Sequence, residues 1–436
     1  MDTIFALSTA PGRAGVAMLR VSGPRARAAL HALSGKEDVP ARRAVLAELR
    51  DPENRQPIDR ALLLWFPGPH SFTGEDIAEF HVHGGRAVVE GLLAALDRIE
   101  GLRLAEPGEF ARRAFAQGKL DLTEAEGLAD LIDAETEGQR LQALRQMRGE
   151  LSGIYEGWRA RLLRVLAYAE ADIDFSEEEL PDALLASLLP DIAALRREME
   201  AHLDDGGRSE KLRDGVEVAI IGPPNVGKSS LLNRLAGREA AIVSEEAGTT
   251  RDVLEVRLVL AGVPVTLADT AGLREAAGMI EAEGVRRALA RAEAADLRLV
   301  VAAAGSVPDF ALAREGDLKI LNKADLGGGA PGSDVVAVSA RDGQGMDGLL
   351  VQLSEKVGER FGLSEHPGVT RARHRAGLEA AKDHLGRAEA GISAQMESAL
   401  VAEELRLAMR ALGRITGRVD VEDLLDLVFR DFCIGK

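Results

Sequence analysis

The eight residues from Gly222 to Ser229, with the sequence GPPNVGKS, constrain the fold of this chain more than any other segment. They follow the apolar run 216–221, which is typical of a buried strand, and precede a helical pattern. Gly227 and Gly222 let the backbone curl so that successive N–H groups and the helix N-terminus face an anion. Lys228 can neutralise the outer phosphates of a nucleotide, and the terminal serine can offer its hydroxyl to Mg²⁺. The segment predicts a phosphate-binding loop, although a glycine-rich turn that binds nothing stays open for this pattern alone.

A second apolar run, 263–268, ends in a carboxylate and a glycine that fit the same kind of site. Asp269 can hold a Mg²⁺-bound water, and Gly272 can approach the terminal phosphate. The segment after Asp269 therefore predicts a sensor of the γ-phosphate.

The base of the nucleotide is predicted by two later segments. In NKAD at 322–325, Asp325 can accept two hydrogen bonds from the N1 and N2 groups of guanine, donors that adenine does not present in that arrangement. The run VVAVSA at 335–340 is expected to be a buried strand whose last two residues line the far side of the base. The sequence predicts a guanine nucleotide.

The segment between the phosphate loop and Asp269 is expected to be a switch. It contains GTTRD at 248–252, and Thr250 is the candidate for the second Mg²⁺ ligand. Leu273 stands after Gly272, where many GTPases have a glutamine, and an apolar side chain cannot orient a nucleophile. Hydrolysis of the nucleotide is therefore slow, or the attacking water is positioned by another group of the chain or by a partner.

The predicted nucleotide contacts come from the phosphate loop, the two switch segments and the base-specificity segments. They are Asn225, Val226, Gly227, Lys228, Ser229, Ser230, Ser244, Glu245, Glu246, Ala247, Gly248, Thr249, Thr250, Asp269, Thr270, Ala271, Gly272, Asn322, Lys323, Asp325, Ser339 and Ala340.

Composition and charge indicate a cytoplasmic protein of several parts. A chain of 436 residues is expected to contain about three domains, and nowhere do eighteen uncharged apolar residues run together. Cys433 is the single cysteine, which excludes intrachain disulfides and a cysteine zinc site. The formal net charge of −17 argues against broad electrostatic binding of RNA. Arginine clusters within helical patterns, such as 371–375, are interpreted as solvated helix faces.

The pattern along the chain predicts an α/β class combined with an all-α part. Short extended and helical runs alternate in the first part, long helical periodicity follows, and it resumes after the nucleotide segments. We expect one discontinuous helical domain interrupted by an inserted Ras-like P-loop GTPase domain with a doubly wound sheet. The expected domains are 1–117, 118–210 for the first helical part, 211–370 for the GTPase domain and 371–436 for the second helical part, which ends in CIGK.

Several short motifs outside the nucleotide segments carry a resemblance that covers essentially the whole chain. They are TAPGRAGV at 9–16, LRVSG at 19–23, SFTGED at 71–76, HGG at 83–85, PGEF at 107–110, KLDL at 119–122 and CIGK at 433–436. With the nucleotide motifs, they make the chain similar to the MnmE (TrmE) family of tRNA-modification GTPases. The final tetrapeptide is the most diagnostic of them.

The resemblance implies a K⁺-dependent catalytic site. Glu281 corresponds to the family's glutamate that handles the hydrolytic water, and Lys228 and Asn225 join it as catalytic residues. The resemblance also places K⁺ at the β/γ bridge, where it stabilises developing charge in place of an arginine finger. The implied metal ligands are Ser229 and Thr250 for Mg²⁺, with Asp269 through water, and Asn225, Ser244, Glu246 and Thr249 for K⁺.

For the N-terminal part, the resemblance implies a folate-binding fold that pairs across a homodimer to bind 5-formyl-tetrahydrofolate. The corresponding contacts are Arg20, Glu79, Lys119 and Lys436, and Lys436 reaches them only if the C-terminal tail packs back onto this domain. A strand would also place Glu79, His81 and His83 on one face, and a metal site is the less favoured interpretation of that set.

The implied chemistry joins this chain to the FAD-dependent partner MnmG (GidA), in a heterotetramer or larger complex. Together they would install an aminomethyl or carboxymethylaminomethyl group on carbon 5 of the wobble uridine of certain tRNAs, with 5,10-methylene-tetrahydrofolate as the one-carbon donor. Two alternatives stay open from the residues: a ribosome-assembly GTPase like Era or Der, and a non-enzymatic, GTP-gated scaffold. The sequence does not indicate which tRNAs are modified, the amine source, or the role of Cys433.

Overall fold

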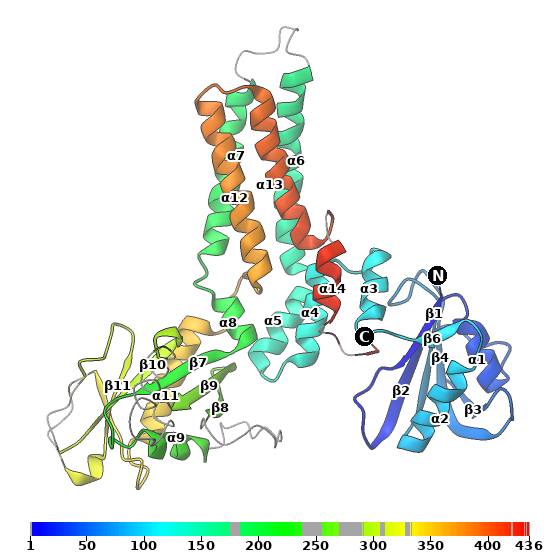
Figure 1. Ribbon diagram of the computed structural model, residues 1–436, viewed down its shortest axis with the longest axis horizontal. Helices are drawn as coiled ribbons and strands as arrows, with labels where there is room; N and C mark the ends of the chain where they lie inside the picture. The colour runs from blue at the N-terminus through cyan, green and yellow to red at the C-terminus, as the bar shows by residue number, and fades with distance from the viewer. Residues whose placement is uncertain are drawn as a thin grey trace, which may run out of the picture. The chain divides into compact units, whose positions relative to one another are not determined.

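The computed structural model of the chain forms two compact units (Figure 1). The first unit contains residues 1–129, 146–185 and 395–436, and the second contains 130–145 and 186–394. The structure describes residues 2–174, 184–237, 255–269, 290, 292–305, 310–327, 332, 334–419, 422–430, 432 and 434–435.

The first unit begins with a six-stranded sheet in the order β3-β4-β5-β2-β1-β6. Its pairs are antiparallel except for β1 with β6. Alternation places Leu63 and Trp65 on the buried face of β4, against α1 and α2, and leaves Leu62 on the other face. The elements are β1 (Thr3–Leu7), β2 (Ala14–Ser22), α1 (Ala26–Ser34), β3 (Val45–Arg50), β4 (Pro57–Phe66), β5 (Ile77–Gly84), α2 (Arg86–Asp97) and β6 (Leu102–Leu104).

Helices complete the first unit. They are α3 (Glu109–Ala116), α6 (Glu150–Asp174), α13 (Ser398–Thr416) and α14 (Glu422–Arg430), while α4 (Leu122–Asp133) and α5 (Glu137–Met147) span the points where the chain changes unit. α13 packs along α6, and Arg406 pairs with Glu170 at 2.7 Å between them. α14 packs against α3, with Phe429 in their shared core.

The second unit combines helices with a second six-stranded sheet. α7 (Leu184–Leu203) and α12 (Ala372–Ser393) are joined by an ion pair between Arg196 and Glu389 at 3.0 Å, and α8 (Arg208–Asp214) leads into the sheet. The strands are β7 (Val216–Ile221), β8 (Glu255–Leu260), β9 (Val263–Asp269), β10 (Leu297–Ala303), β11 (Leu318–Asn322) and β12 (Val335–Ala337). Their order is β12-β11-β10-β7-β9-β8, and every pair is parallel except β8 with β9.

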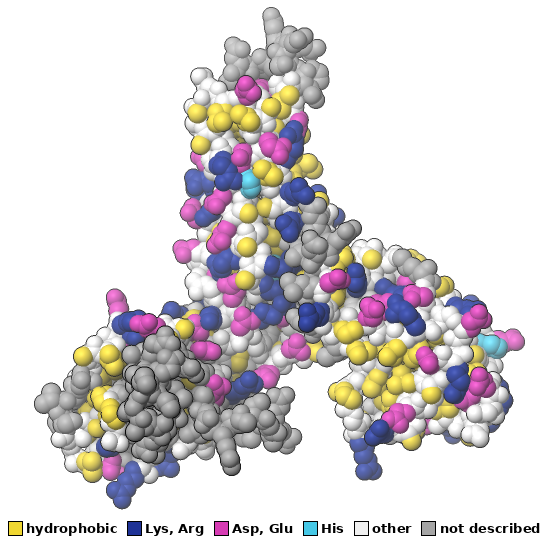
Figure 2. Space-filling view, viewed as in Figure 1, with side chains coloured by type: hydrophobic (Ala, Val, Ile, Leu, Met, Phe, Trp, Pro, Cys, Tyr) yellow, Lys and Arg dark blue, Asp and Glu magenta, His cyan; other side chains and the backbone are white. Residues whose placement is uncertain are grey.

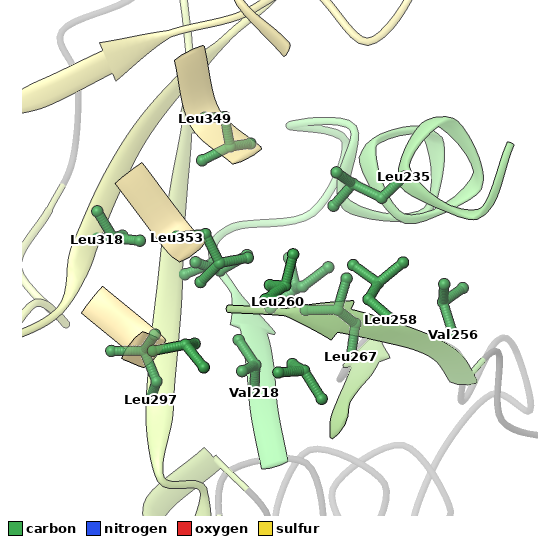
Figure 3. Close-up of a cluster of buried hydrophobic side chains, with 14 of the residues drawn as sticks. Val218, Leu235, Val256, Leu258, Leu260, Leu267, Leu297, Leu318, Leu349 and Leu353 are labelled. Atoms are coloured by element: carbon green, nitrogen blue, oxygen red, sulfur yellow. The ribbon is translucent and has the colours of Figure 1, made fainter. Parts of the chain in front are cut away.

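Two sets of side chains cover the two faces of this second sheet. α9 (Lys228–Ala236) and α11 (Met346–Phe361) pack on one face, and Figure 3 shows Leu235, Leu349 and Leu353 turned toward the strand residues of this core. A smaller cluster containing Ile221 and Ala292 lies on the other face. The predicted fold class is confirmed: an N-terminal α/β part, helices, and a doubly wound sheet around the phosphate loop.

The last predicted strand of the nucleotide part needs a correction. We expected a buried strand over 335–340, but β12 covers only Val335–Ala337 and its three residues are half-buried. The reason is its place at the sheet edge, next to β11 alone, whereas Val338 and Ser339 beyond it are fully buried. The run is apolar because its end, rather than its strand, enters the core.

The arginines of 371–375 do not form the expected solvated helix face. Arg371, Arg373 and Arg375 are half-buried, and Arg371 pairs with Asp130 of α4 at 2.7 Å, because carboxylates of neighbouring helices face this segment. Arg375 is bonded to Asp205 at 3.0 Å and to Glu210 at 2.8 Å. Figure 2 shows Lys and Arg side chains interspersed with Asp and Glu on the visible face. Within the described part of the chain, none of the helices combines the length and apolarity that a membrane span requires.

Candidate functional site

The phosphate loop connects β7 to α9 and is held closely against two neighbouring strands. Gly227 has a φ of 95°, and a Cβ there would run into the side-chain amide of Asn322 on β11. A Cβ at Gly222 would collide with the carbonyl oxygen of Val301 on β10. Glycine is therefore required at both positions by close packing as well as by backbone conformation.

Lys228 lies inside the curve of this loop and is 7% exposed. Its Nζ donates to the carbonyl oxygens of Gly222 at 2.8 Å and Pro223 at 2.9 Å. Burial lowers the pKa of Lys228, and the negative charge of Asp269 opposes this shift. The loop thus holds a desolvated ammonium group, whose charge is worth more to an anion than that of a lysine in water.

Ser229 and Asp269 meet at the start of α9. Ser229 Oγ donates to Asp269 Oδ2 at 2.6 Å, although forty positions separate the two residues. They are brought together because β9 runs parallel to β7, with Asp269 opposite Ile220. A hydroxyl and a carboxylate at this spacing are the hard oxygen donors that suit Mg²⁺.

Asn322 ties the base-specificity segment to the phosphate loop. Its Nδ2 donates to the carbonyl oxygen of Val226 at 2.9 Å, and its Oδ1 accepts from the Ala340 N–H at 3.1 Å. Lys323, at a φ of 63°, donates from Nζ to the carbonyl oxygen of Asn225 at 2.7 Å. The asparagine and lysine of the motif therefore shape the loop, a role that the sequence analysis did not assign to them.

Asp325 is oriented by a buried hydroxyl and remains exposed. Ser339 is fully buried, and its Oγ donates to Asp325 Oδ1 at 2.9 Å. This bond fixes the carboxylate while leaving its other lone pairs accessible. The structure brings together the described members of the predicted nucleotide site: residues 225–230, Asp269, Asn322, Lys323, Asp325, Ser339 and Ala340.

A second polar site lies in the N-terminal sheet, where Arg20 on β2 stands opposite Glu79 on β5. Arg20 donates to Glu79 Oε1 from Nε at 3.0 Å and from Nη2 at 2.9 Å. Its guanidinium carbon lies 5.5 Å from the ring centroid of Phe72 and 5.8 Å from that of Phe110. The rings hold the guanidinium in place. Neither phenylalanine was among the predicted site residues, although Phe72 lies in the motif at 71–76 and Phe110 in that at 107–110.

The described C-terminal residues, Ile434 and Gly435, pack against the end of β1 and against Pro107. Ser8 Oγ donates to the carbonyl oxygen of Gly435 at 2.9 Å, and Ile434 forms a bridge with Pro107. Gly435 has a φ of 99° and lies so near the Leu7 carbonyl that a Cβ would collide with it. The predicted return of the tail to this domain is therefore present up to residue 435.

The remaining candidate residues of this domain are more dispersed. Lys119 is exposed, and its Cε lies 3.2 Å from where a Cβ on Gly74 would stand. His81 Nε2 is 3.4 Å from Glu79 Oε2, whereas the His83 ring bonds Asp59 at 2.8 Å. Within the described ranges, no group of three or more potential metal ligands comes together.

Comparisons with known proteins show the family of the chain. A family model described as the MnmE helical domain matches residues 122–433, and one described as the GTP-binding protein TrmE N-terminus matches residues 3–119. The tRNA modification GTPase MnmE of Parvibaculum lavamentivorans is 66% identical over 100% of both chains. The chain belongs to the MnmE family. A second MnmE, from Paramagnetospirillum magneticum, is 54% identical over 100% of both chains.

Solved structures also resemble part of this MnmE family member. The G domain of the T. maritima FeoB iron transporter is 27% identical, with a TM-score of 0.25, and covers 33% of this chain and 98% of that chain. Era from Aquifex aeolicus, bound to GDP·AlF4−, is 23% identical, with a TM-score of 0.26. The match covers 39% of this chain and 66% of the Era chain.

Several of the candidate site residues lie outside the described part of the chain, as does Cys433, for which no role was predicted. They are Ser244, Glu245, Glu246, Ala247, Gly248, Thr249, Thr250, Thr270, Ala271, Gly272, Glu281 and Lys436. Their roles, and the expected domain boundaries, stay predictions.

Proposed function

We propose that this chain is a GTP hydrolase that acts in the modification of the wobble uridine of tRNA. The observation that carries the nucleotide part is the junction at the phosphate loop. There Ser229 bonds Asp269 at 2.6 Å, and Asn322 joins the loop to the segment that carries Asp325. The names of its MnmE relatives support the tRNA part.

The residues of the loop would bind GTP by complementary charge and hydrogen bonding. Lys228 would leave the carbonyls of Gly222 and Pro223 and donate to the outer phosphates, while the loop N–H groups face the phosphate oxygens. Asp325, held by Ser339, would accept from guanine N1 and N2. Adenine presents no such donor pair, so the site discriminates between the two bases.

Metal ions fit the donors that this loop presents. Ser229 would ligate Mg²⁺, with Asp269 through a water and Thr250 as the second hydroxyl, and the ion would neutralise charge on the phosphates. Asn225, which adopts a left-handed backbone conformation in the loop with a φ of 62°, would ligate K⁺. Carbonyls of Ser244, Glu246 and Thr249 would complete that site.

The attacking water would be oriented by Glu281, since Leu273 cannot do so. Phosphate release from GTP, measured in KCl and in NaCl, tests this assignment. Faster release in KCl, lost in Glu281→Gln, is expected. Equal rates in the two salts would reject the K⁺ site and the role of Glu281 that is built on it.

The N-terminal site would bind a tetrahydrofolate. Arg20, Lys119 and Lys436 offer cations to the folate carboxylates, and Glu79 offers an acceptor to the pterin donors. The Arg20–Glu79 pair and the docked tail are the observations that support this assignment. Calorimetry with 5-formyl-tetrahydrofolate should show binding that Arg20→Ala abolishes and that Arg27→Ala, at an exposed position of α1, leaves intact. Binding unchanged by Arg20→Ala would place the folate elsewhere.

The working complex would be a cytoplasmic homodimer that acts with the flavoprotein MnmG and receives its one-carbon unit from 5,10-methylene-tetrahydrofolate. Deletion of the gene should remove the aminomethyl or carboxymethylaminomethyl group from carbon 5 of the wobble uridine, measured by mass spectrometry of tRNA nucleosides. Ribosome profiles on sucrose gradients should stay normal. Normal uridine modification together with abnormal ribosome profiles would instead indicate a ribosome-assembly GTPase.

A further inference from the structure

The turn between β8 and β9 touches a helix that is far from it in sequence. The Gly138 N–H, in the first turn of α5, donates to the carbonyl oxygen of Gly262 at 3.2 Å. Gly262 and Ala261 form the two-residue turn, with φ values of 77° and 51°. The turn thus presents a carbonyl to an N–H that the first turn of a helix leaves without an intrahelical partner.

The contact is close enough to require glycine at position 138. A Cβ there would stand 2.5 Å from the Gly262 carbonyl oxygen and 2.9 Å from Leu212 Cδ1. Glycine costs about 1 kcal/mol relative to alanine inside a helix, so close approach is the physical reason for it here. Gly348 in the first turn of α11 differs, because a Cβ there would meet nothing within 4 Å.

The start of α5 is itself fixed in place. Gln139 N–H donates to Thr136 Oγ1 at 3.2 Å, and Gln139 Oε1 accepts from the Thr136 N–H at 3.2 Å, which is a reciprocal helix cap. Gln139 Nε2 also donates to the Arg213 carbonyl at 2.8 Å, and Gln142 Nε2 to the Ser209 carbonyl at 2.9 Å. α5 is therefore anchored to α8, which leads into the phosphate-loop strand β7.

β9 connects this contact to the phosphate site. The strand has seven residues, so its ends are about 20 Å apart. One end is the turn at Gly262, and the other is Asp269, which bonds Ser229. A strand hydrogen-bonded on both sides transmits displacement along its axis better than a loop does.

The turn also packs against α11. A Cβ on Gly358 would stand 3.0 Å from Ala261 Cβ, and an open groove of about 590 Å³ beside this contact is lined by Ala261, Val351 and Ser354 among others. The turn is therefore in contact with both α5 and α11, and a displacement at either helix reaches it directly.

We propose that the Gly138–Gly262 contact, hereafter the joint, couples the conformation of α5 to the nucleotide state of the phosphate site. Strand β9 links the joint to that site. The proposal rests on the proposed binding of guanine nucleotides and adds the place where nucleotide state reaches the helices. Because coupling between two sites is reciprocal, a change at Gly138 must alter how the site distinguishes GTP from GDP. A merely structural role for Gly138 would change both affinities together.

The test compares Gly138→Ala with the matched variant Gly348→Ala in the full chain. The dissociation constants for GDP and a non-hydrolysable GTP analogue are measured by calorimetry, and their ratio is the readout. We expect Gly138→Ala to change the ratio about fivefold or more, and Gly348→Ala to leave it within twofold. An unchanged ratio in Gly138→Ala would overturn the joint.

A second variant keeps the proposal testable if Gly138→Ala does not fold. Gln142→Ala removes one of the two hydrogen bonds that anchor α5 on α8, without introducing a clash, and it should change the same ratio in the same direction by a smaller factor. An unchanged ratio in Gln142→Ala would then reject the joint. If the wild-type chain binds neither nucleotide, the proposed function fails with it, whereas binding with ratios insensitive to these variants rejects the joint alone.

Discussion

Asn322→Ala is the substitution whose effect on the nucleotide site can be worked out most fully. Asn322 is 2% exposed, and its side chain donates a hydrogen bond to the Val226 carbonyl oxygen at 2.9 Å and accepts one from the Ala340 N–H at 3.1 Å. Alanine leaves both backbone groups without this partner. A buried polar group that loses its partner costs about 1–3 kcal/mol, so the pair costs about 2–4 kcal/mol if water partly replaces one bond.

The loss should appear in nucleotide affinity, because both bonds hold segments that are predicted to contact the nucleotide. At about 1.4 kcal/mol for each tenfold change, binding weakens about 30- to 700-fold. Titration with a fluorescent GDP derivative measures this. Asn233→Ala is the matched control, since Asn233 is exposed on α9 and its replacement should change little. Affinity within threefold of wild type for Asn322→Ala, with unchanged circular dichroism, would refute the reasoning.

Three further predictions address other parts of the chain. Burial raises the pKa of Glu109, but hydrogen bonds led by Arg103 outweigh burial and leave the pKa below its usual value. The ionised carboxylate therefore stabilises the fold above the unfolded pKa of about 4.5, and this contribution is lost as pH falls through the lower folded pKa. Glu109→Gln should lower the free energy of unfolding by about 1–3 kcal/mol at pH 7, measured by urea unfolding. At pH 3.5 the free energies of unfolding of the variant and the wild type should differ by less. The same difference at both pH values would contradict this prediction. Gly435→Ala should release the tail from Leu7 and weaken the binding of 5-formyl-tetrahydrofolate, measured by calorimetry, at least about tenfold, because the loss of about 1.4 kcal/mol of binding free energy is enough for that change. Gly15→Ala is the control, since a Cβ at Gly15 would have open space around it and binding should be unchanged. Ser229→Ala should raise the Mg²⁺ concentration for half-maximal GTP turnover about tenfold or more, and an unchanged Mg²⁺ dependence would remove Ser229 from the ion site.

Much of the nucleotide site could be predicted from the sequence because its residues stand at the ends of regular elements. An apolar run followed by a glycine-rich turn indicates a parallel strand leading into a helix, and parallel strands bring their carboxyl ends to one edge of the sheet. Ser229 and Asp269 meet for that reason. The length of β12 could not be predicted in this way, because an apolar hexapeptide does not show that its strand lies at a sheet edge.

Contacts that depend on tertiary packing were beyond the sequence. Nothing in the local pattern indicates that Phe72 and Phe110 hold Arg20, because a phenylalanine next to a loop is equally typical of core packing. The role of Gly138 was hidden for the same reason, since its partner Gly262 lies in another domain of the predicted organisation. A glycine in the first turn of a helix signals close approach only when the approaching segment is known.

Phosphate release by the purified full-length chain, with GTP and with ATP as alternative substrates in Mg²⁺ and KCl, tests the central claim most directly. The account predicts release from GTP, little from ATP, and a change in this preference when Asp325 is replaced by asparagine, because the amide presents a donor where guanine needs an acceptor. Comparable release from GTP and ATP, or a preference unaffected by Asp325→Asn, would contradict it.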